Sequence, residues 1–116
     1  MDEDCTVYRI ANFVGKRWTI LILFELCKNE KPKRFSELKK SLPHITAKIL
    51  STRLKELEKE GLIIKSVRTL PIQSEYKLTK SGKEFFKIIK ELKSWSLTWK
   101  TNNKLCKQTH CEKCKI

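Results

Sequence analysis

Apolar residues recur along this 116-residue chain at spacings that predict mainly helices with one β-hairpin. Residues 5–13 have the pattern of a short helix, and Gly15 can end it in the left-handed conformation that often follows a last helical turn. Residues 18–27 (WTILILFELC) are apolar on nearly every side, which predicts a buried central helix. Within this helix, Trp18 and Cys27 are expected to be core residues.

Two further helices are predicted after a basic connector, residues 28–34. The first is short and closed by Pro43, and the second begins at the N-cap Thr46 and runs to residue 60, where Gly61 stops it. The apolar stripe of the second helix consists of Ala47, Leu50, Leu54 and Leu57, and its opposite face carries Lys48, Thr52, Lys55 and Lys59. This second helix is therefore amphipathic and basic.

The C-terminal half of the chain predicts a hairpin followed by a long helix. Residues 62–68 and 74–79 are strand-like, and the turn lies between them with Pro71 at or near its tip. From residue 80 to about residue 99, the helical period returns. In that segment Phe85, Leu92 and Trp99 repeat every seven residues, with Ile88, Ile89 and Trp95 in the adjoining positions. The predicted class is mainly α with a small β-hairpin (α+β).

The charge of the chain is strongly asymmetric. Residues 1–27 hold three basic and four acidic side chains (net −1), whereas residues 28–116 hold 23 basic and nine acidic ones (net +14). This balance favours a polyanionic partner, nucleic acid before an anionic membrane. The longest apolar stretch is shorter than the ~20 residues that span a bilayer, and the N-terminus is acidic, unlike a signal peptide. We therefore expect a cytoplasmic protein without a membrane partner.

The two predicted helices on either side of the turn at residues 42–45 form a candidate helix-turn-helix, and the basic hairpin after them makes it a winged helix. A helix fits the major groove of DNA, where base edges present distinguishable patterns, and lysines beside it neutralise phosphates. Lysines on a single helix more commonly only solvate its surface. The turn, the hairpin and the net charge together favour DNA binding instead.

Several segments resemble, in order and at the expected spacing, the HxlR-type transcriptional regulators, which are winged-helix relatives of the MarR group. These segments are GKRW (15–18), RFSEL (34–38), LPHIT (42–46), LSTRLKELE (50–58), GL (61–62) and EYKLTKSG (75–82). The resemblance covers residues 5–99. It implies a homodimeric, sequence-specific DNA-binding regulator whose helix 46–60 reads the major groove. It also implies that the hairpin at 67–74 reaches the minor groove or backbone and that the terminal helices pair two subunits.

The candidate site residues follow from these assignments. Groove contacts are expected from Lys48, Ser51, Thr52 and Lys55, backbone contacts from Arg34, Lys39 and Lys40, and wing contacts from Arg68 and Gln73. Thr46 combines capping with a phosphate contact, whereas Arg53 either reaches a phosphate or pairs with a nearby acid. The dimerisation candidates are Phe85, Ile88, Ile89, Leu92, Trp95 and Trp99. A helix with two tryptophans has more apolar surface than a small domain readily covers, although the stripe could also pack within its own subunit.

Residues 1–100 are expected to form the winged-helix and dimerisation domain, and residues 101–116 a basic, cysteine-containing tail. The chain has no Gly-rich phosphate loop, paired acids or nucleophile–base motif, so an enzyme is not expected. The alternative is a non-sequence-specific architectural DNA- or RNA-binding winged-helix protein, which the excess of lysine favours. The operator, the regulated genes, the direction of regulation and the effector cannot be predicted from the residues.

The cysteines suggest two routes to an effector response. Cys5 matches the position where many HxlR-type proteins carry an N-terminal cysteine, which some members use to sense electrophiles or oxidants. Its acidic neighbours Asp2, Glu3 and Asp4 disfavour the thiolate, so an unreactive thiol is the alternative. In the tail, soft ligands for zinc or another thiolate-bound metal are Cys106, His110, Cys111 and Cys114. A disulfide or thiol switch and an inert tail are the alternatives to a metal there.

Overall fold

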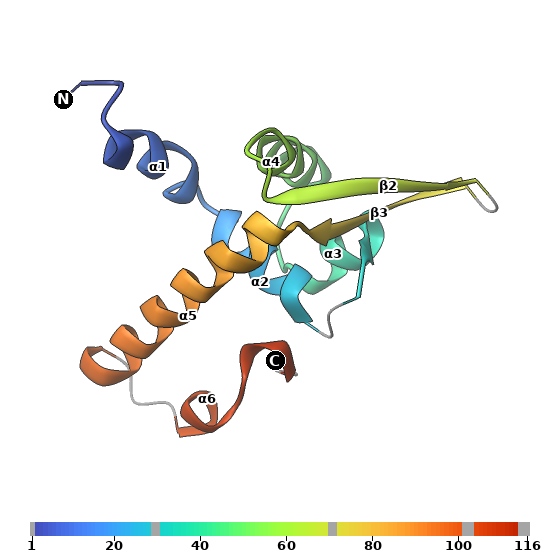
Figure 1. The fold of residues 1–116 in the computed structure, drawn as a ribbon. Helices are drawn as coiled ribbons and strands as arrows, with labels where there is room; N and C mark the ends of the chain where they lie inside the picture. The colour runs from blue at the N-terminus through green and yellow to red at the C-terminus, as the bar shows by residue number, and fades with distance from the viewer. Residues whose placement is uncertain (1, 29–30, 70–71, 101–103, 114–116) are drawn as a thin grey trace.

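The computed structural model describes residues 2–28, 31–69, 72–100 and 104–113. Its helices are α1 (Thr6–Val14), α2 (Thr19–Cys27), α3 (Phe35–Ser41), α4 (Ala47–Lys59), α5 (Lys80–Trp99) and α6 (Lys104–Gln108), followed by the 3-10 turn η2 (Cys111–Lys113) (Figure 1). The strands β1 (Lys33–Arg34), β2 (Ile63–Thr69) and β3 (Ile72–Leu78) form one antiparallel sheet in the order β1-β3-β2. The mainly α winged helix-turn-helix fold predicted from the sequence is confirmed.

Helix α2 is the centre of the core, as its apolar sequence predicted. Ile22 and Leu23 are fully buried, and the helix contacts α3, α5 and β3. Cys27 is buried at its end, whereas Trp18 is only half-buried against the core. The other buried side chains come from every layer: Leu38, Leu42, Ile45, Leu50, Leu54, Leu57, Leu62, Ile63, Tyr76, Leu78, Phe86 and Ile89. Burying side chains of this size contributes about 1.5–3 kcal/mol each, so the core fixes the positions of α3, α4 and the sheet together.

Two threonines and one glycine set the ends of α4 and α5. The Thr46 Oγ1 atom accepts a hydrogen bond from the Ile49 backbone N–H (3.1 Å), and Thr79 caps α5 in the same way. Gly61 has φ +79° and ends α4, as predicted. The Thr79 hydroxyl also donates to the Gly61 carbonyl oxygen (2.6 Å). The end of α4 is thereby tied to the start of α5.

The predicted left-handed conformation of Gly15 is wrong. Gly15 has φ −73°, in the right-handed region, and glycine is needed there because a Cβ atom would lie 2.7 Å from the Ala11 carbonyl oxygen. The left-handed residue is Trp18 (φ 82°), at the N-cap of α2. This conformation costs a non-glycine residue roughly 1–2 kcal/mol, which packing of the indole against the core and the Arg17 guanidinium offsets.

The basic connector before α3 contains a strand that the sequence did not predict. Lys33 and Arg34 form β1, which pairs with Tyr76 and Glu75 of β3. Two residues are too few to show a periodic pattern, and the neighbouring proline and charges are typical of a loop. The hairpin also extends further than predicted, since its strands pair out to Thr69 and Ile72. The predicted turn residue Pro71 lies outside the described residues.

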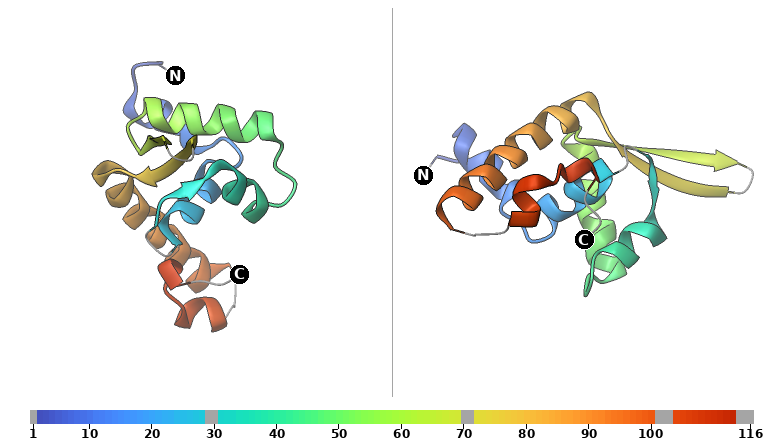
Figure 2. Two further views of the ribbon diagram at one scale, coloured as in Figure 1. Left: turned by 90° about the vertical axis from the view of Figure 1, so that its right-hand side faces the viewer. Right: turned by 90° about the horizontal axis from the view of Figure 1, so that it is seen from below.

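The described part of the tail folds back onto the domain (Figure 2). The Lys93 ammonium on α5 donates to the Thr109 carbonyl oxygen (2.9 Å), and Lys90 forms an ion pair with Glu112 of η2. The segment of α6 and η2 is therefore held against α5. Within the described ranges, no helix combines the length and apolar content needed to cross a membrane.

Candidate nucleic-acid interface

The turn between α3 and α4 is held by two buried side chains and one strained residue. Leu42 and Ile45 are buried in the core, and the Ile45 N–H donates to the Leu42 carbonyl oxygen (3.3 Å). Between them, His44 is exposed and has φ 70°. Histidine is among the non-glycine residues that adopt this region more readily than most. The turn thus fixes α4 relative to α3, which is the geometry of a helix-turn-helix.

Helix α4 presents the predicted polar face to solvent. Lys48, Thr52 and Lys55 are exposed, and Ser51 beside them is half-buried. The opposite face is buried through Leu50, Leu54 and Leu57, but Ala47 is exposed rather than part of the apolar stripe. Helix α4 runs along the outer surface of the molecule (Figure 2, left). The predicted groove residues therefore lie on one accessible face.

The charge on α4 changes sign along its length. From Thr46 to Lys55 the helix carries Lys48, Arg53 and Lys55 and no acidic residue, whereas Glu56, Glu58 and Glu60 follow. The N-terminus of a helix also carries the positive end of its dipole. The first half of α4 is therefore suited to a polyanion and the second half is not.

The Thr52 hydroxyl is engaged within its own helix. Its Oγ1 atom donates a hydrogen bond to the Lys48 carbonyl oxygen at 2.9 Å. Because the only proton of the hydroxyl is used in this bond, the group is left with acceptor capacity toward solvent and a methyl group beside it. Thr52 can therefore accept from a base amino group or contact an apolar base edge.

Arg53 pairs with an acid, which was one of its two predicted roles. Its guanidinium lies 3.3 Å from a Glu56 carboxylate oxygen, and its Nε donates to the Arg17 carbonyl oxygen (3.2 Å). Lys16 pairs with the same Glu56 carboxylate at 3.1 Å. These contacts join α4 to the segment between α1 and α2, so the Arg53 side chain holds α4 against that segment.

Arg34 links α3 to the wing, the hairpin of β2 and β3. Its Nη1 donates to the Gln73 Oε1 atom (3.2 Å), and its Nε lies 3.1 Å from a Glu37 carboxylate oxygen. Hydrogen bonds from the backbone N–H and then the side chain of Arg34 lower the pKa of Glu37 below its usual value. Predicted DNA contacts Arg34 and Gln73 are thus bonded to one another. Lys39 and Lys40, by contrast, are exposed on the last turn of α3.

The wing projects away from the body and is rich in cations (Figure 1). Arg68 lies across the hairpin from Glu75, with 3.2 Å between Nε and a carboxylate oxygen. The Arg68 side chain is 64% exposed and that of Glu75 only 14%, so the guanidinium is the group that an outside partner meets. Lys65 and Lys77 are exposed on the same two strands.

The predicted dimerisation stripe divides into two faces of α5. Ile89 is buried in the core of its own subunit, and Phe85 is partly buried against that core and the Phe13 ring. Both side chains therefore already have packing partners within the chain, and a role for them in dimerisation remains a prediction. The face left exposed consists of Ile88, Leu92, Trp95 and Trp99, each more than half exposed. We call these four residues the outer stripe of α5.

The cysteine candidates are only partly described. Cys5 at the N-cap of α1 and Cys106 on α6 are half-buried, and Cys27 is buried. His110 is exposed, while the side chain of Cys111 and all of Cys114 lie outside the described set. Among the side chains that are described, no three His, Cys, Asp or Glu residues gather to hold a metal ion. The metal site predicted for the tail remains a prediction.

A helix-turn-helix followed by a hairpin wing and a long terminal helix defines a winged helix-turn-helix transcription regulator. Residues 13–104 match the family model described as HxlR-like helix-turn-helix, and the chain belongs to this family. It is 38% identical over 99 residues to YvaP, an HTH-type transcriptional regulator of Bacillus subtilis (strain 168), covering 84% of this chain and 90% of YvaP. The protein is therefore a DNA-binding transcription regulator and not an enzyme, as predicted.

Solved structures agree with this assignment. The reduced form of the transcriptional regulator YodB from B. subtilis superposes with a TM-score of 0.75 at 32% identity, over 85% of this chain and 97% of YodB. A regulator assigned to the MarR family from Porphyromonas gingivalis W83 gives a TM-score of 0.73 at 34% identity, over 84% and 94% of the two chains. YodB has also been solved in quinone-bound and diamide-treated forms.

Proposed function

We propose that the protein binds double-stranded DNA in a sequence-specific manner as a homodimer. The first half of α4 enters the major groove, and the wing lies against the minor groove or the backbone. The observation that carries this proposal is the exposed, acid-free face of α4 from Thr46 to Lys55, with the basic wing beside it. Recognition helices contact base edges through their N-terminal residues, and this is the half of α4 that is positive.

The exposed side chains of this face divide into two groups by chemistry. Lys48, Thr52 and Lys55 reach base edges, with lysine donating to guanine and Thr52 accepting from a base amino group. Ser51 is half-buried and makes at most an edge contact. Phosphate contacts, which position the protein but do not specify sequence, come from Thr46, Lys39, Lys40 and Arg68. Arg34 and Gln73, being bonded to each other, hold the wing against α3.

The second subunit covers the outer stripe of α5. Its four residues are spaced four, three and four positions apart, which places them on one helix face. Two of them are tryptophans, and a continuous band of exposed apolar side chains on the surface of a protein is typical of an interface. On α1, Val7 and Ile10 are also exposed. A twofold arrangement would give two recognition helices for two half-sites.

The test is selection of DNA sites from a random pool, followed by footprinting with competitor DNA. A sequence-specific regulator selects one motif with two half-sites and retains it against excess non-specific DNA, because specific binding is typically 10³-fold or more tighter. An architectural protein, the alternative favoured by the lysine excess, selects no motif and is displaced by competitor. The second outcome would overturn the proposal.

For the effector, we propose a thiol response at Cys5 or at the tail cysteines, or a metal at the tail. The thiols of Cys5 and Cys106 are half-buried, whereas that of Cys27 is buried, and the related YodB has a quinone-bound form. Three measurements distinguish these sites. Mass spectrometry locates quinone adducts, and elemental analysis detects a bound metal. DNA binding is then compared for Cys5→Ser and for the triple serine variant of Cys106, Cys111 and Cys114. No adduct, no metal and unchanged DNA affinity in both variants would refute the effector proposal.

A further inference from the structure

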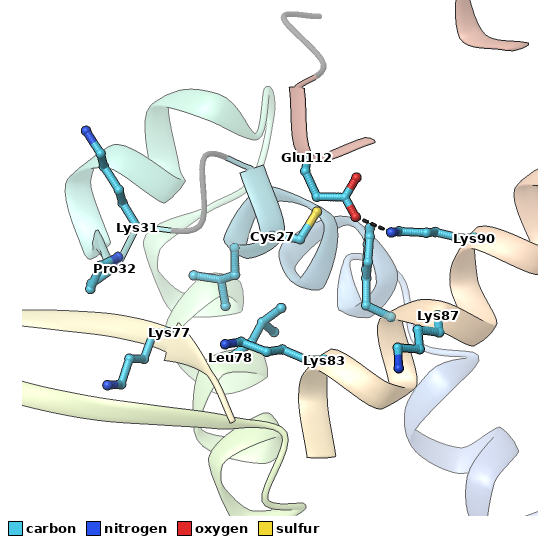
Figure 3. Close-up of a pocket in the computed structure, with 11 residues that line it drawn as sticks. Cys27, Lys31, Pro32, Lys77, Leu78, Lys83, Lys87, Lys90 and Glu112 are labelled. Atoms are coloured by element: carbon cyan, nitrogen blue, oxygen red, sulfur yellow. Dashed lines mark ion pairs between the residues drawn. The ribbon is translucent and has the colours of Figure 1, made fainter. Parts of the chain in front are cut away.

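A cavity of about 270 Å³ lies between the end of α2, the segment before β1, the end of β3, the first half of α5 and the tail (Figure 3). Its wall is apolar in the middle, where Leu26, Cys27, Leu78 and Phe86 line it. These side chains belong to the buried core. The cavity therefore reaches from the surface down to the core and offers contact area to an apolar group.

Cations surround this apolar wall. The described lysines that line the cavity are Lys31, Lys77, Lys83, Lys87 and Lys90, and the acid among the described lining residues is Glu112. The lysines come from three separate segments: the residues before β1, strand β3 and helix α5. Figure 3 shows Lys31 on one side of Cys27 and Lys90 on the other. Like charges that converge in this way repel one another, so an anion among them is stabilised by all of them.

Among the described residues, some of these ammonium groups have an ion-pair partner and others have none. Lys87 pairs with Glu84 at 3.1 Å, and Lys90 pairs with Glu112. In the described part of the chain, no carboxylate lies within ion-pair distance of Lys77 or Lys83. Both lysines line the cavity, and Figure 3 shows Lys83 beside Leu78 and Lys77 on the adjoining part of β3. Positive charge is thus available directly beside the apolar wall.

We propose that this cavity binds a small organic anion, with its apolar body against Leu78 and Phe86 and its anionic head at Lys77 and Lys83. Ligand pockets commonly measure about 300–1,000 Å³ and combine an apolar lining with a few convergent polar groups. A volume of about 270 Å³ is slightly below this range. It fits a short alkyl or single-ring carboxylate better than a nucleotide or a lipid with two chains.

The tail supplies an internal competitor for the same charges. The hydrogen bond from Lys90 lowers the pKa of Glu112, so its carboxylate is ionised at neutral pH. This carboxylate occupies one anion position at the cavity wall and satisfies Lys90. The substitution Glu112→Gln removes this negative charge from the cavity wall, and binding of an anion is expected to tighten by about threefold.

The experiment uses the full chain without DNA, so its result does not depend on the proposed function. Hexanoate, 1-hexanol and acetate are titrated into labelled protein, and amide chemical shifts are followed. We expect saturable shifts around Leu78 and Phe86 with hexanoate, and binding at least about tenfold weaker for the other two, since each lacks the head or the body that the site recognises. Equal binding of hexanoate and 1-hexanol would refute the proposal.

Two lysine variants locate the site. Lys83→Gln should weaken hexanoate binding by about five- to tenfold, because a charged hydrogen-bond donor at the head is lost. Lys80→Gln, on the same helix but outside the cavity, removes the same charge and should have less than a twofold effect. Equal effects of the two variants would show attraction by net charge alone and overturn the site.

Discussion

Helices α4 and α5 both have an apolar buried face, but their exposed faces differ in chemical character. Both bury aliphatic or aromatic residues against the core, but α4 exposes Lys48 and Lys55 whereas α5 exposes Leu92 and Trp95. A lysine face loses little in water and gains from a polyanion. An apolar face gains only when another apolar face covers it. The inner faces therefore determine the fold, and the outer faces determine which partner each helix accepts.

The wing and the C-terminal half of α5 also lie well apart. The wing and the C-terminal half of α5 extend from opposite ends of the molecule (Figure 1). A second subunit on the outer stripe of α5 would therefore leave the polar face of α4 accessible. This separation allows each face to be altered without direct damage to the other, which the following predictions use.

The largest effect is expected from Leu92→Lys. The substitution places a charge in the centre of the outer stripe, which is half exposed in one subunit but buried in a dimer. The protein should sediment as a monomer, and DNA affinity should fall by at least about 100-fold because two linked reading heads become one. The fold of the monomer should be unchanged by circular dichroism.

Ser94→Lys is the matched control, since it adds the same side chain at an exposed position of α5 outside the stripe. It should remain dimeric and bind DNA with nearly unchanged affinity. If the Leu92→Lys protein stays dimeric, the outer stripe is not part of the dimer interface, and α5 does not differ from α4 in the partner that it accepts.

A smaller, more selective effect is expected from Thr52→Ala combined with Lys55→Ala. Each base contact contributes about 1–3 kcal/mol of discrimination, so affinity for the selected site should fall by about 30-fold or more. Affinity for non-specific DNA should fall only a few-fold, as measured by titration on both DNAs. The control pair Lys59→Ala with Glu60→Ala, beyond the acid-free half of α4, should leave the ratio unchanged. Equal losses on both DNAs would favour the architectural alternative.

Most of the fold could be predicted because strong local signals coincide with it. Thr46 and Gly61 mark the ends of α4, and both act as predicted. Strand β1 could not be predicted, because its pairing with β3 is a long-range contact of two polar residues. The prediction for Gly15 was wrong for a related reason. Glycine is required at this position because the Ala11 carbonyl oxygen approaches closely, and not because the backbone is left-handed there.

The candidate site was predictable at the level of faces but less so at the level of contacts. On α5, both Phe85 with Ile89 and Ile88 with Leu92 satisfy helical spacing, and the spacing alone does not say which pair faces inward. The bond between Arg34 and Gln73 joins residues 39 positions apart, and no local pattern predicts it. The lysine-lined cavity is likewise assembled from distant segments, each of which has an ordinary charged sequence.

Lys39→Ala tests the distinction between positioning and reading. Lys39 is exposed on α3, away from the face of α4 that reaches base edges in our proposal. Its loss should weaken specific and non-specific binding about equally, by a few-fold, and lower the slope of log affinity against log salt by about one. Lys104→Ala on α6 removes the same charge far from the wing and serves as the control. A loss confined to the specific site would make Lys39 a reading residue.

The smallest effect concerns Glu37 and pH. Its pKa is lowered in the folded protein, first by the Arg34 backbone N–H and then by the Arg34 side chain, so the ionised carboxylate favours the folded state. This contribution is complete above the unfolded pKa of about 4.3 and is lost as pH falls through the lowered folded value. Because the side chain is 48% exposed, solvent screening limits the contribution to less than about 1 kcal/mol. Denaturant unfolding of wild type and Glu37→Gln should therefore differ at pH 7 and converge toward pH 3. A difference that persists at pH 3 would show that the carboxylate charge is not what stabilises the contact between α3 and the wing through Arg34.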